Sequence, residues 1–194
     1  MRIVAGRFKG RPLRTPGTDA IRPTSDRVRE SLFNVLQHGI ADVSLDGARV
    51  LDLFAGTGAL GFEAISRGAA SCLFVEEDAQ ARGLIRANME ALSLTGITKL
   101  FRRDATSLGP AGKLGTFDLV LLDPPYGRGL GEAALLSAMV GGWLAPGAIV
   151  VLEERTGAAV DLPAPLALLD RRVYGDTQVL IARLPAPLPA PGAA

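Results

Sequence analysis

Residues 49–67 constrain the fold of this chain more than any other stretch of the sequence. An apolar run at 49–53 is typical of a buried strand, and a helical pattern at 59–67 follows it. Two glycines, Gly56 and Gly58, lie in the turn between the strand and the helix, and a third, Gly61, lies in the first turn of the helix. Glycine accepts a positive φ and lets a ligand approach the backbone, and the start of a helix offers unpaired N–H groups. Strand, glycine turn and helix therefore predict a nucleotide-type cofactor site.

Strand and helix patterns alternate along the rest of the chain. Apolar runs predict strands at 49–53, 71–75, 100–102, 117–122 and 148–153, with helices at 59–67, 79–94 and 131–140. The last two runs, 166–174 and 178–184, are too close for a helical crossover, so they should pair antiparallel. We therefore expect an α/β fold with a doubly wound, mostly parallel seven-stranded sheet and an antiparallel C-terminal strand. The segment 156–165 is short and interrupted by proline, which leaves little room for a helix before the sixth strand.

The N-terminal part is basic and differs from the rest of the chain. Residues 1–22 predict short strands or a β-hairpin, and 26–38 predicts a helix whose apolar side packs on the main domain, with Arg29 off that side. Basic residues crowd this part: Arg2, Arg7, Lys9, Arg11, Arg14, Arg22, Arg27 and Arg29. They favour either a phosphate-contacting surface or a solvated, mobile arm. The expected organisation is a basic extension at 1–40, a main domain at 41–184 and a disordered Pro/Ala tail at 185–194.

The composition excludes several classes of site. The formal net charge is only +1, and the chain has one cysteine, Cys72, and one histidine, His38. These counts rule out an intramolecular disulfide and a multi-histidine metal site, so we expect no metal. The sequence shows no apolar run long enough to span a membrane, and charge interrupts its start too early for a signal peptide, so we expect a cytoplasmic protein.

Four acidic residues lie at or just after the ends of successive predicted strands: Asp52, Glu76, Asp104 and Asp123. Because the carboxyl ends of parallel strands meet at one edge, these side chains should converge on one site. Glu76 fits the ribose hydroxyls of a cofactor, with a helix N-terminal charge as its other interpretation. Asp104 fits an adenine amino group or a helix cap. Asp52 would either order the glycine turn or face the cationic end of the cofactor.

The tetrapeptide Asp-Pro-Pro-Tyr at 123–126 directly follows the fourth strand. Its prolines stiffen the loop and remove two N–H donors, so that Asp123 and the carbonyl of Pro124 stand as neighbouring acceptors. Two acceptors suit an exocyclic amine, and Tyr126 offers a flat face on which a base can stack. An ordinary Pro-Pro turn after a core strand is the alternative.

Residues 52–58, Asp-Leu-Phe-Ala-Gly-Thr-Gly, together with Asp-Pro-Pro-Tyr, resemble a class I S-adenosylmethionine-dependent amino methyltransferase with a Rossmann-like fold. Three further segments narrow the resemblance: 22–34, 74–78 and Tyr174-Gly-Asp-Thr177. Together they resemble, over 1–184, the RsmD family, which methylates the exocyclic N2 of one guanine in small-subunit (16S) ribosomal RNA.

The resemblance implies roles for particular residues. S-adenosylmethionine would be held by Asp52, Phe54, Ala55, Gly56, Thr57, Gly58, Glu76, Asp104 and Ala105. The guanine would be held by the catalytic residues Asp123, Pro124 and Tyr126, and the rRNA by Arg7, Lys9, Arg11, Arg14, Arg22 and Arg27. The expected partner is 16S rRNA within an assembled or nearly assembled small subunit, and the expected state is a monomer.

Three alternatives stay open at this point. A DNA or RNA adenine-N6 methyltransferase also uses Asp-Pro-Pro-Tyr, although the chain has no length to spare for a target-recognition domain. An NAD-binding oxidoreductase would use the same glycine turn but leaves Asp-Pro-Pro-Tyr without a role. A non-catalytic RNA-binding protein with this fold would not need all four strand-end acids.

Overall fold

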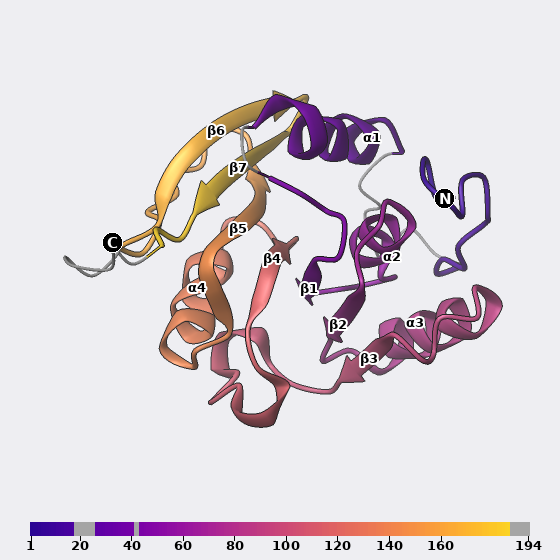
Figure 1. The fold of residues 1–194 in the computed structure, drawn as a ribbon. Helices are drawn as coiled ribbons and strands as arrows, with labels where there is room; N and C mark the ends of the chain where they lie inside the picture. Colours follow the sequence, from indigo (N-terminus) through magenta and orange to yellow (C-terminus); the bar gives the residue numbers. More distant parts are fainter. Residues whose placement is uncertain (18–25, 41–42, 187–194) are drawn as a thin grey trace, which may run out of the picture.

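The computed structural model describes residues 1–17, 26–40 and 43–186, and these form one seven-stranded sheet with helices on both faces (Figure 1). The strand order is β3-β2-β1-β4-β5-β7-β6. The strands are β1 Arg49–Leu53, β2 Ser71–Val75, β3 Thr98–Phe101, β4 Phe117–Leu122, β5 Leu144–Arg155, β6 Ala167–Tyr174 and β7 Thr177–Arg183. The first five pair in parallel, and β7 runs antiparallel to both β5 and β6. The predicted fold class is therefore confirmed.

The helices cover the sheet in two layers. They are α1 Asp26–Asn34, α2 Ala59–Ser66, α3 Ala79–Ala91 and α4 Leu130–Val140, with a π-helical turn η1 at Val35–Gly39 and short 3-10 turns η2 at Ala105–Ser107 and η3 at Gly112–Leu114. In β4, Leu119 and Leu121 join the buried cluster under α1, α2 and α3, whereas Val120 and Leu122 join the cluster under α4. Because successive strand residues point to opposite faces, a strand covered on both faces reads as one apolar run.

Several boundaries differ from the predicted ones. The helix predicted at 26–38 is α-helical only to Asn34, and strand β5 begins at Leu144 rather than at 148. Helix α3 ends at Ala91 rather than at 94 because Ser93 adopts a left-handed conformation, with φ of 57°. Glycine usually marks such a helix end, so the end at Ala91 was not predictable from Ser93. Between β5 and β6 the chain forms turns and no helix, as predicted, and β6 is a largely exposed edge strand.

Arg29 is a correction to the predicted pattern. Its position off the apolar side of the helix suggested a solvated cation, but its side chain is completely buried. The Arg29 guanidinium donates to the backbone carbonyl of Arg2 at 2.5 Å and to the carboxylate of Asp26 at 2.7 Å. The buried cation therefore ties α1 to the start of the chain.

Residues 1–14, the N-terminal arm, are fixed on α2 and α3 rather than free in solvent (Figure 1). The arm folds back on itself like the predicted hairpin, through a β-bridge between Arg2 and Pro12 and through backbone hydrogen bonds from Ile3 to Arg11 and from Leu13 to Met1, but neither side forms a regular strand. Ile3 and Leu13 are buried in the cluster that also holds the helices α1 to α3. The arm thus shares the core of the main domain.

Candidate functional site

The ends of the central parallel strands bring the predicted acids to one edge of the sheet. Asp52 lies on β1, Glu76 follows β2 and Asp123 follows β4. Burial raises the pKa of Asp52 well above its usual range, and the negative charges of Asp123 and Glu76 raise it further. The strand register agrees, because Leu53 lies beside both Val75 of β2 and Leu122 of β4, the residues that directly precede Glu76 and Asp123. The predicted convergence is therefore observed for these three residues.

Asp52 organises the start of helix α2. Its buried Oδ2 accepts a hydrogen bond from the N–H of Gly61 at 2.9 Å, and this bond works against the rise in its pKa. Of the two roles considered for Asp52, the structure shows the ordering of the turn. A carboxylate near the first turn of a helix also suits the helix dipole.

The three glycines of the turn serve different purposes. A Cβ on Gly58 would lie 2.6 Å from the ring of Phe62, and one on Gly61 would lie 2.4 Å from the ring of Phe74. These two positions are glycine because of close packing, in addition to the positive φ of Gly58. A Cβ on Gly56 would meet only the carbonyl of Phe54, at 3.9 Å. The backbone at Gly56 is thus the part of the turn that an external group can approach.

Glu76 bridges the glycine turn and the start of α3. Its Oε2 accepts from the N–H of Gly56 at 2.7 Å, and its Oε1 accepts from the N–H of Asp78 at 2.8 Å. A carboxylate oxygen has two acceptor sites, so each oxygen can accept a further hydrogen bond from a ligand hydroxyl. The helix cap of α3 is Asp78, which accepts from Ala81, so Glu76 is not needed for capping.

The remaining predicted cofactor residues are distributed around the turn. Asp104 caps η2, since its Oδ1 accepts from the N–H and the hydroxyl of Thr106, each at 2.8 Å. Both bonds end on Oδ1, so Oδ2 can accept a hydrogen bond from a ligand. Phe54 has an unpredicted positive φ of 56°, and Ala55 and Ala105 are buried. The hydroxyl of Thr57 lies 3.6 Å from the sulfur of Met1, so that side chain faces the N-terminal arm.

Residues 123–127, the candidate base-binding loop, leave the end of β4 at the same edge. Pro124 is buried, whereas Asp123 and Tyr126 are half-buried. The Tyr126 hydroxyl lies 3.1 Å from the Thr177 hydroxyl of β7, and the N–H of Gly127 donates to Glu154 of β5 at 3.0 Å. Neither Thr177 nor Glu154 was among the predicted site residues. Glu154 could have been considered because two acidic residues end the apolar run of β5. Thr177 could have been considered because it belongs to the segment Tyr174–Thr177, which is part of the family resemblance.

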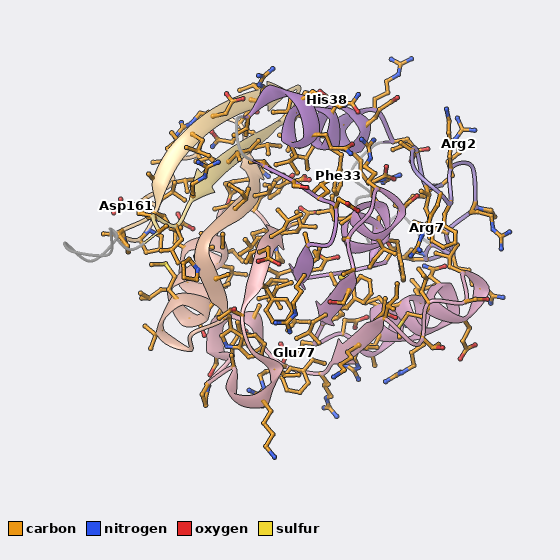
Figure 2. All side chains as sticks on the ribbon, viewed as in Figure 1. Arg2, Arg7, Phe33, His38, Glu77 and Asp161 are labelled. Carbon is orange, nitrogen blue, oxygen red and sulfur yellow. The ribbon has the colours of Figure 1, made fainter. Side chains whose placement is uncertain are left out.

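The predicted RNA-binding residues lie on the surface, apart from one outside the described residues. Arg7, Lys9, Arg11 and Arg14 of the N-terminal arm are exposed, as is Arg27 of α1. Arg22 lies outside the described residues. Figure 2 shows the side chains of Arg2 and Arg7 on the arm, at the side of the molecule away from β6. Arg27 lines a separate groove of about 510 Å³ between α1 and Arg172 of β6.

Two kinds of feature are absent from the described part of the chain. Residues 1–17, 26–40 and 43–186 contain no group of three or more His, Cys, Asp or Glu side chains arranged to hold a metal ion. None of their helices combines the length and the apolar character that crossing a bilayer requires.

Comparison with known proteins places this geometry among methyltransferases. A family model described as conserved hypothetical protein 95 matches residues 1–183. Ribosomal RNA small subunit methyltransferase D of Escherichia coli K12 is 38% identical over 176 residues, which cover 90% of this chain and 85% of that protein. A solved structure of yhhF, a candidate methyltransferase from Escherichia coli, has 35% identity and a TM-score of 0.81, over 96% of this chain and 98% of that chain.

A more distant solved structure shares the fold alone. It is an RNA methyltransferase from Salinibacter ruber in complex with S-adenosyl-L-homocysteine, with 16% identity and a TM-score of 0.63, over 87% of this chain and 97% of that chain. The seven-stranded sheet is thus the Rossmann-like methyltransferase sheet. The matches run from the N-terminal arm to β7.

Proposed function

The chain belongs to the RsmD family, whose family model is described as conserved hypothetical protein 95, and from that premise we propose that it methylates rRNA. The proposed reaction transfers a methyl group from S-adenosylmethionine to the exocyclic N2 amine of a guanine in small-subunit (16S) rRNA. One observation carries the proposal: strand β4 pairs with β1 up to Leu122 and Leu53, so the base-binding loop and the glycine turn leave neighbouring strands at the same edge. Base site and cofactor turn therefore share one edge of the sheet.

The residues at the glycine turn fit S-adenosylmethionine. Gly56 leaves the backbone open to approach, Glu76 retains acceptor sites for ribose hydroxyls, and Asp104 has an oxygen for the adenine amino group. The charges of Glu76 and Asp123 also make the edge negative, which suits a sulfonium cation. When bound, S-adenosylmethionine supplies a methyl group that is already activated on sulfur.

The base-binding loop would orient the amine. Asp123 and the carbonyl of Pro124 would accept the two N–H groups of the guanine amine and hold its nitrogen in line with the methyl group. The half-buried ring of Tyr126 would stack on the base. Loss of a proton from the methylated nitrogen completes the reaction, and Asp123 or a water molecule would accept it.

The N-terminal arm would bind the rRNA backbone. Its backbone is fixed by the packing of Ile3 and Leu13, while its basic side chains remain exposed. Cations on a fixed scaffold contact phosphates without the entropy cost of ordering a free segment. The proposed substrate is the assembled or nearly assembled small subunit.

The direct test is methyl transfer from radiolabelled S-adenosylmethionine to small subunits that lack the modification, to naked 16S rRNA and to duplex DNA. Label recovered as N2-methylguanosine from subunits is the expected result. Label recovered as N6-methyladenine from DNA would overturn the substrate while leaving fold and cofactor in place. Binding of S-adenosylhomocysteine without any transfer would instead favour a non-catalytic RNA-binding protein.

Two sets of variants assign the parts of the site. Asp123→Ala should abolish transfer and leave cofactor binding in place, with the exposed Asp161→Ala as matched control.

The second set tests the N-terminal arm. Changing Arg7, Lys9, Arg11 and Arg14 together to Gln should make the slope of log K for rRNA binding against log salt concentration less steep by about 3. The matched control removes the same number of positive charges from exposed residues outside the arm, namely Arg86, Lys99, Lys113 and Arg171. An equal change in the two sets would show that the arm has no special role.

A further inference from the structure

We propose that Thr177 and Glu154 are positioning residues for methyl transfer, because they fix the base-binding loop from the neighbouring strands. This inference rests on the proposed function and extends it to two residues that lie outside the Asp-Pro-Pro-Tyr motif. Neither residue is assigned contact with the base or with the cofactor; both act through Tyr126 and Gly127.

Thr177 fixes the outer end of the Tyr126 ring. Its hydroxyl lies 3.1 Å from the Tyr126 hydroxyl, and its own side chain is only 9% exposed. As the first residue of β7, Thr177 pairs with both Arg155 and Tyr174, so its backbone is held from two sides. A β-branched side chain on a paired strand also has little χ1 freedom. The Tyr126 ring is therefore held at two points, at one end by its covalent bond to the Tyr126 Cβ and at the other by the hydroxyl contact with Thr177.

Glu154 fixes the backbone immediately after that ring. Its Oε1 accepts from the N–H of Gly127 at 3.0 Å and from the N–H of Arg155 at 2.6 Å, and the residue is only 4% exposed. A buried carboxylate is costly unless donors compensate it, and here the Gly127 N–H of the loop is one of two donors. Gly127 has φ of +73°, so the chain turns sharply at the point where Glu154 holds it.

The loop needs such external contacts because of its own composition. Pro124 and Pro125 lack N–H groups, so neither can donate a backbone hydrogen bond to the sheet. The prolines make the loop stiff but do not attach it to the sheet. Hydrogen bonds at Tyr126 and Gly127 supply that attachment, from β7 and β5 respectively.

Attachment of the loop matters for the proposed reaction because the Tyr126 ring sets the depth of the stacked base. The amine must lie in line with the methyl group while it contacts Asp123 and the Pro124 carbonyl. Small misplacements of reacting groups reduce rates strongly. Fixing Tyr126 and Gly127 therefore positions the amine without contacting it.

Four variants test the contact between Tyr126 and Thr177. Thr177→Val keeps the shape and removes only the hydroxyl, and Tyr126→Phe removes the partner hydroxyl. Each should lower kcat/KM about three- to tenfold, which corresponds to one neutral hydrogen bond, and leave the affinity for S-adenosylhomocysteine unchanged. Thr177→Ser should restore the wild-type value. The double variant should lose no more than either single variant, since both remove the same bond. A wild-type kcat/KM for Thr177→Val, or additive losses in the double variant, would overturn the role of Thr177.

The chain offers a matched tyrosine as control. Tyr174 is the only other tyrosine, and its hydroxyl lies 2.9 Å from that of Ser31 in α1. Tyr174→Phe thus removes a similar hydroxyl bond one strand away and should leave kcat/KM within about twofold of wild type. A loss equal to that of Tyr126→Phe would show that any tyrosine hydroxyl bond in this sheet has the same effect, and the proposal would fail.

Hydrogen exchange tests the role of Glu154 without any methyl transfer. Glu154→Gln replaces a charge-assisted bond to the Gly127 N–H by a weaker neutral one, so exchange of that amide should quicken about three- to tenfold. The amide of Leu180 in β7 should keep its rate, which would show that the sheet is intact. Unchanged exchange at Gly127 would overturn the role of Glu154. If wild-type protein methylates no guanine, the proposed function fails, yet Gly127 exchange in Glu154→Gln and Thr177→Val still decides whether the loop is held.

Discussion

Asn88 of α3 holds the backbone of Arg14 at both of its polar groups. Its Oδ1 accepts from the Arg14 N–H at 2.7 Å, and its Nδ2 donates to the Arg14 carbonyl at 3.2 Å. The same Nδ2 donates to the carbonyl of Thr57 in the glycine turn at 3.2 Å. One buried amide thus joins the N-terminal arm, helix α3 and the cofactor turn.

Asn88→Leu should destabilise the protein by about 2–3 kcal/mol, because a leucine of similar volume leaves backbone groups of Arg14 and Thr57 without partners. Urea unfolding measures the free energy, and hydrogen exchange at the Arg14 amide reports whether the arm loosens. Gln80→Leu, at an exposed position of the same helix, is the control and should stay within about 0.5 kcal/mol of wild type. Equal midpoints for Asn88→Leu and Gln80→Leu would contradict this account.

A buried carboxylate fixes the other end of the arm. Glu63 of α2 is completely buried; its Oε2 accepts from the N–H of Val4 at 2.8 Å and its Oε1 from the N–H of Ala5 at 3.1 Å. Arg67 donates to Oε1 at 2.7 Å, and Nε of Arg29 lies 3.8 Å from Oε2. The single carboxylate therefore compensates two cations and two backbone donors.

Glu63→Gln should cost about 3–5 kcal/mol, since it leaves the buried guanidinium of Arg67 without its counter-charge and that of Arg29 with Asp26 alone. Thermal or urea unfolding provides the measurement. Asp170→Asn breaks the exposed pair with Arg172 on β6 and should cost at most about 1 kcal/mol. A Glu63→Gln variant as stable as Asp170→Asn would show that the cluster contributes no more than a surface ion pair.

The sequence predicted local features well and missed pairings between distant residues. Strand and helix positions follow from apolar periodicity within one segment, and the run at 117–122 correctly indicated a strand covered on both faces. The burial of Arg29 was not predictable in this way, because its partner Glu63 lies on another helix. The positive φ of Phe54 and Ser93 likewise escaped prediction, since neither is a residue that usually marks such a conformation.

The candidate site shows the same division. Convergence of Asp52, Glu76 and Asp123 followed from the topology of parallel strands, which the sequence pattern supplies. The hydrogen bonds that Glu154 and Thr177 make to the loop at 123–127 depend on the pairing of β5 with β7. No local pattern specifies which side chain of a neighbouring strand faces a loop.

Gly61 and Gly83 are both helical glycines, and alanine should act on them in opposite directions. A Cβ at Gly61 would lie 2.4 Å from the ring of Phe74, 2.6 Å from the sulfur of Cys72 and 2.9 Å from Asp52. Gly61→Ala should therefore destabilise by about 1–3 kcal/mol or more, and weaken binding of S-adenosylhomocysteine. A Cβ at Gly83 meets nothing within 4 Å, so Gly83→Ala should stabilise by about 0.5–1 kcal/mol. Unfolding midpoints of the two variants provide the comparison, and a shift of the same sign in both would contradict it.

The buried carboxyl of Asp52 should make stability depend on pH. Burial, followed by the charges of Asp123 and Glu76, raises its pKa well above the usual value, although the bond from Gly61 opposes the rise. The unfolded chain releases this proton near pH 4, whereas the folded protein retains it to a higher pH. The folded state therefore binds more protons across that window, and the contribution of Asp52 to the free energy of unfolding falls as pH rises through it.

Asp52→Asn removes this titration while its side-chain carbonyl can still accept from Gly61. Relative to wild type, the variant should gain stability from about pH 4 upward and reach a constant difference above the folded pKa of Asp52. Urea unfolding of both proteins at pH values from about 4 to 8 gives the difference curve. Asp161→Asn, an exposed carboxyl, should give a nearly flat curve over the same range. A flat curve for Asp52→Asn as well, or wild type gaining on the variant as pH rises, would mean that Asp52 stays ionised in the folded protein.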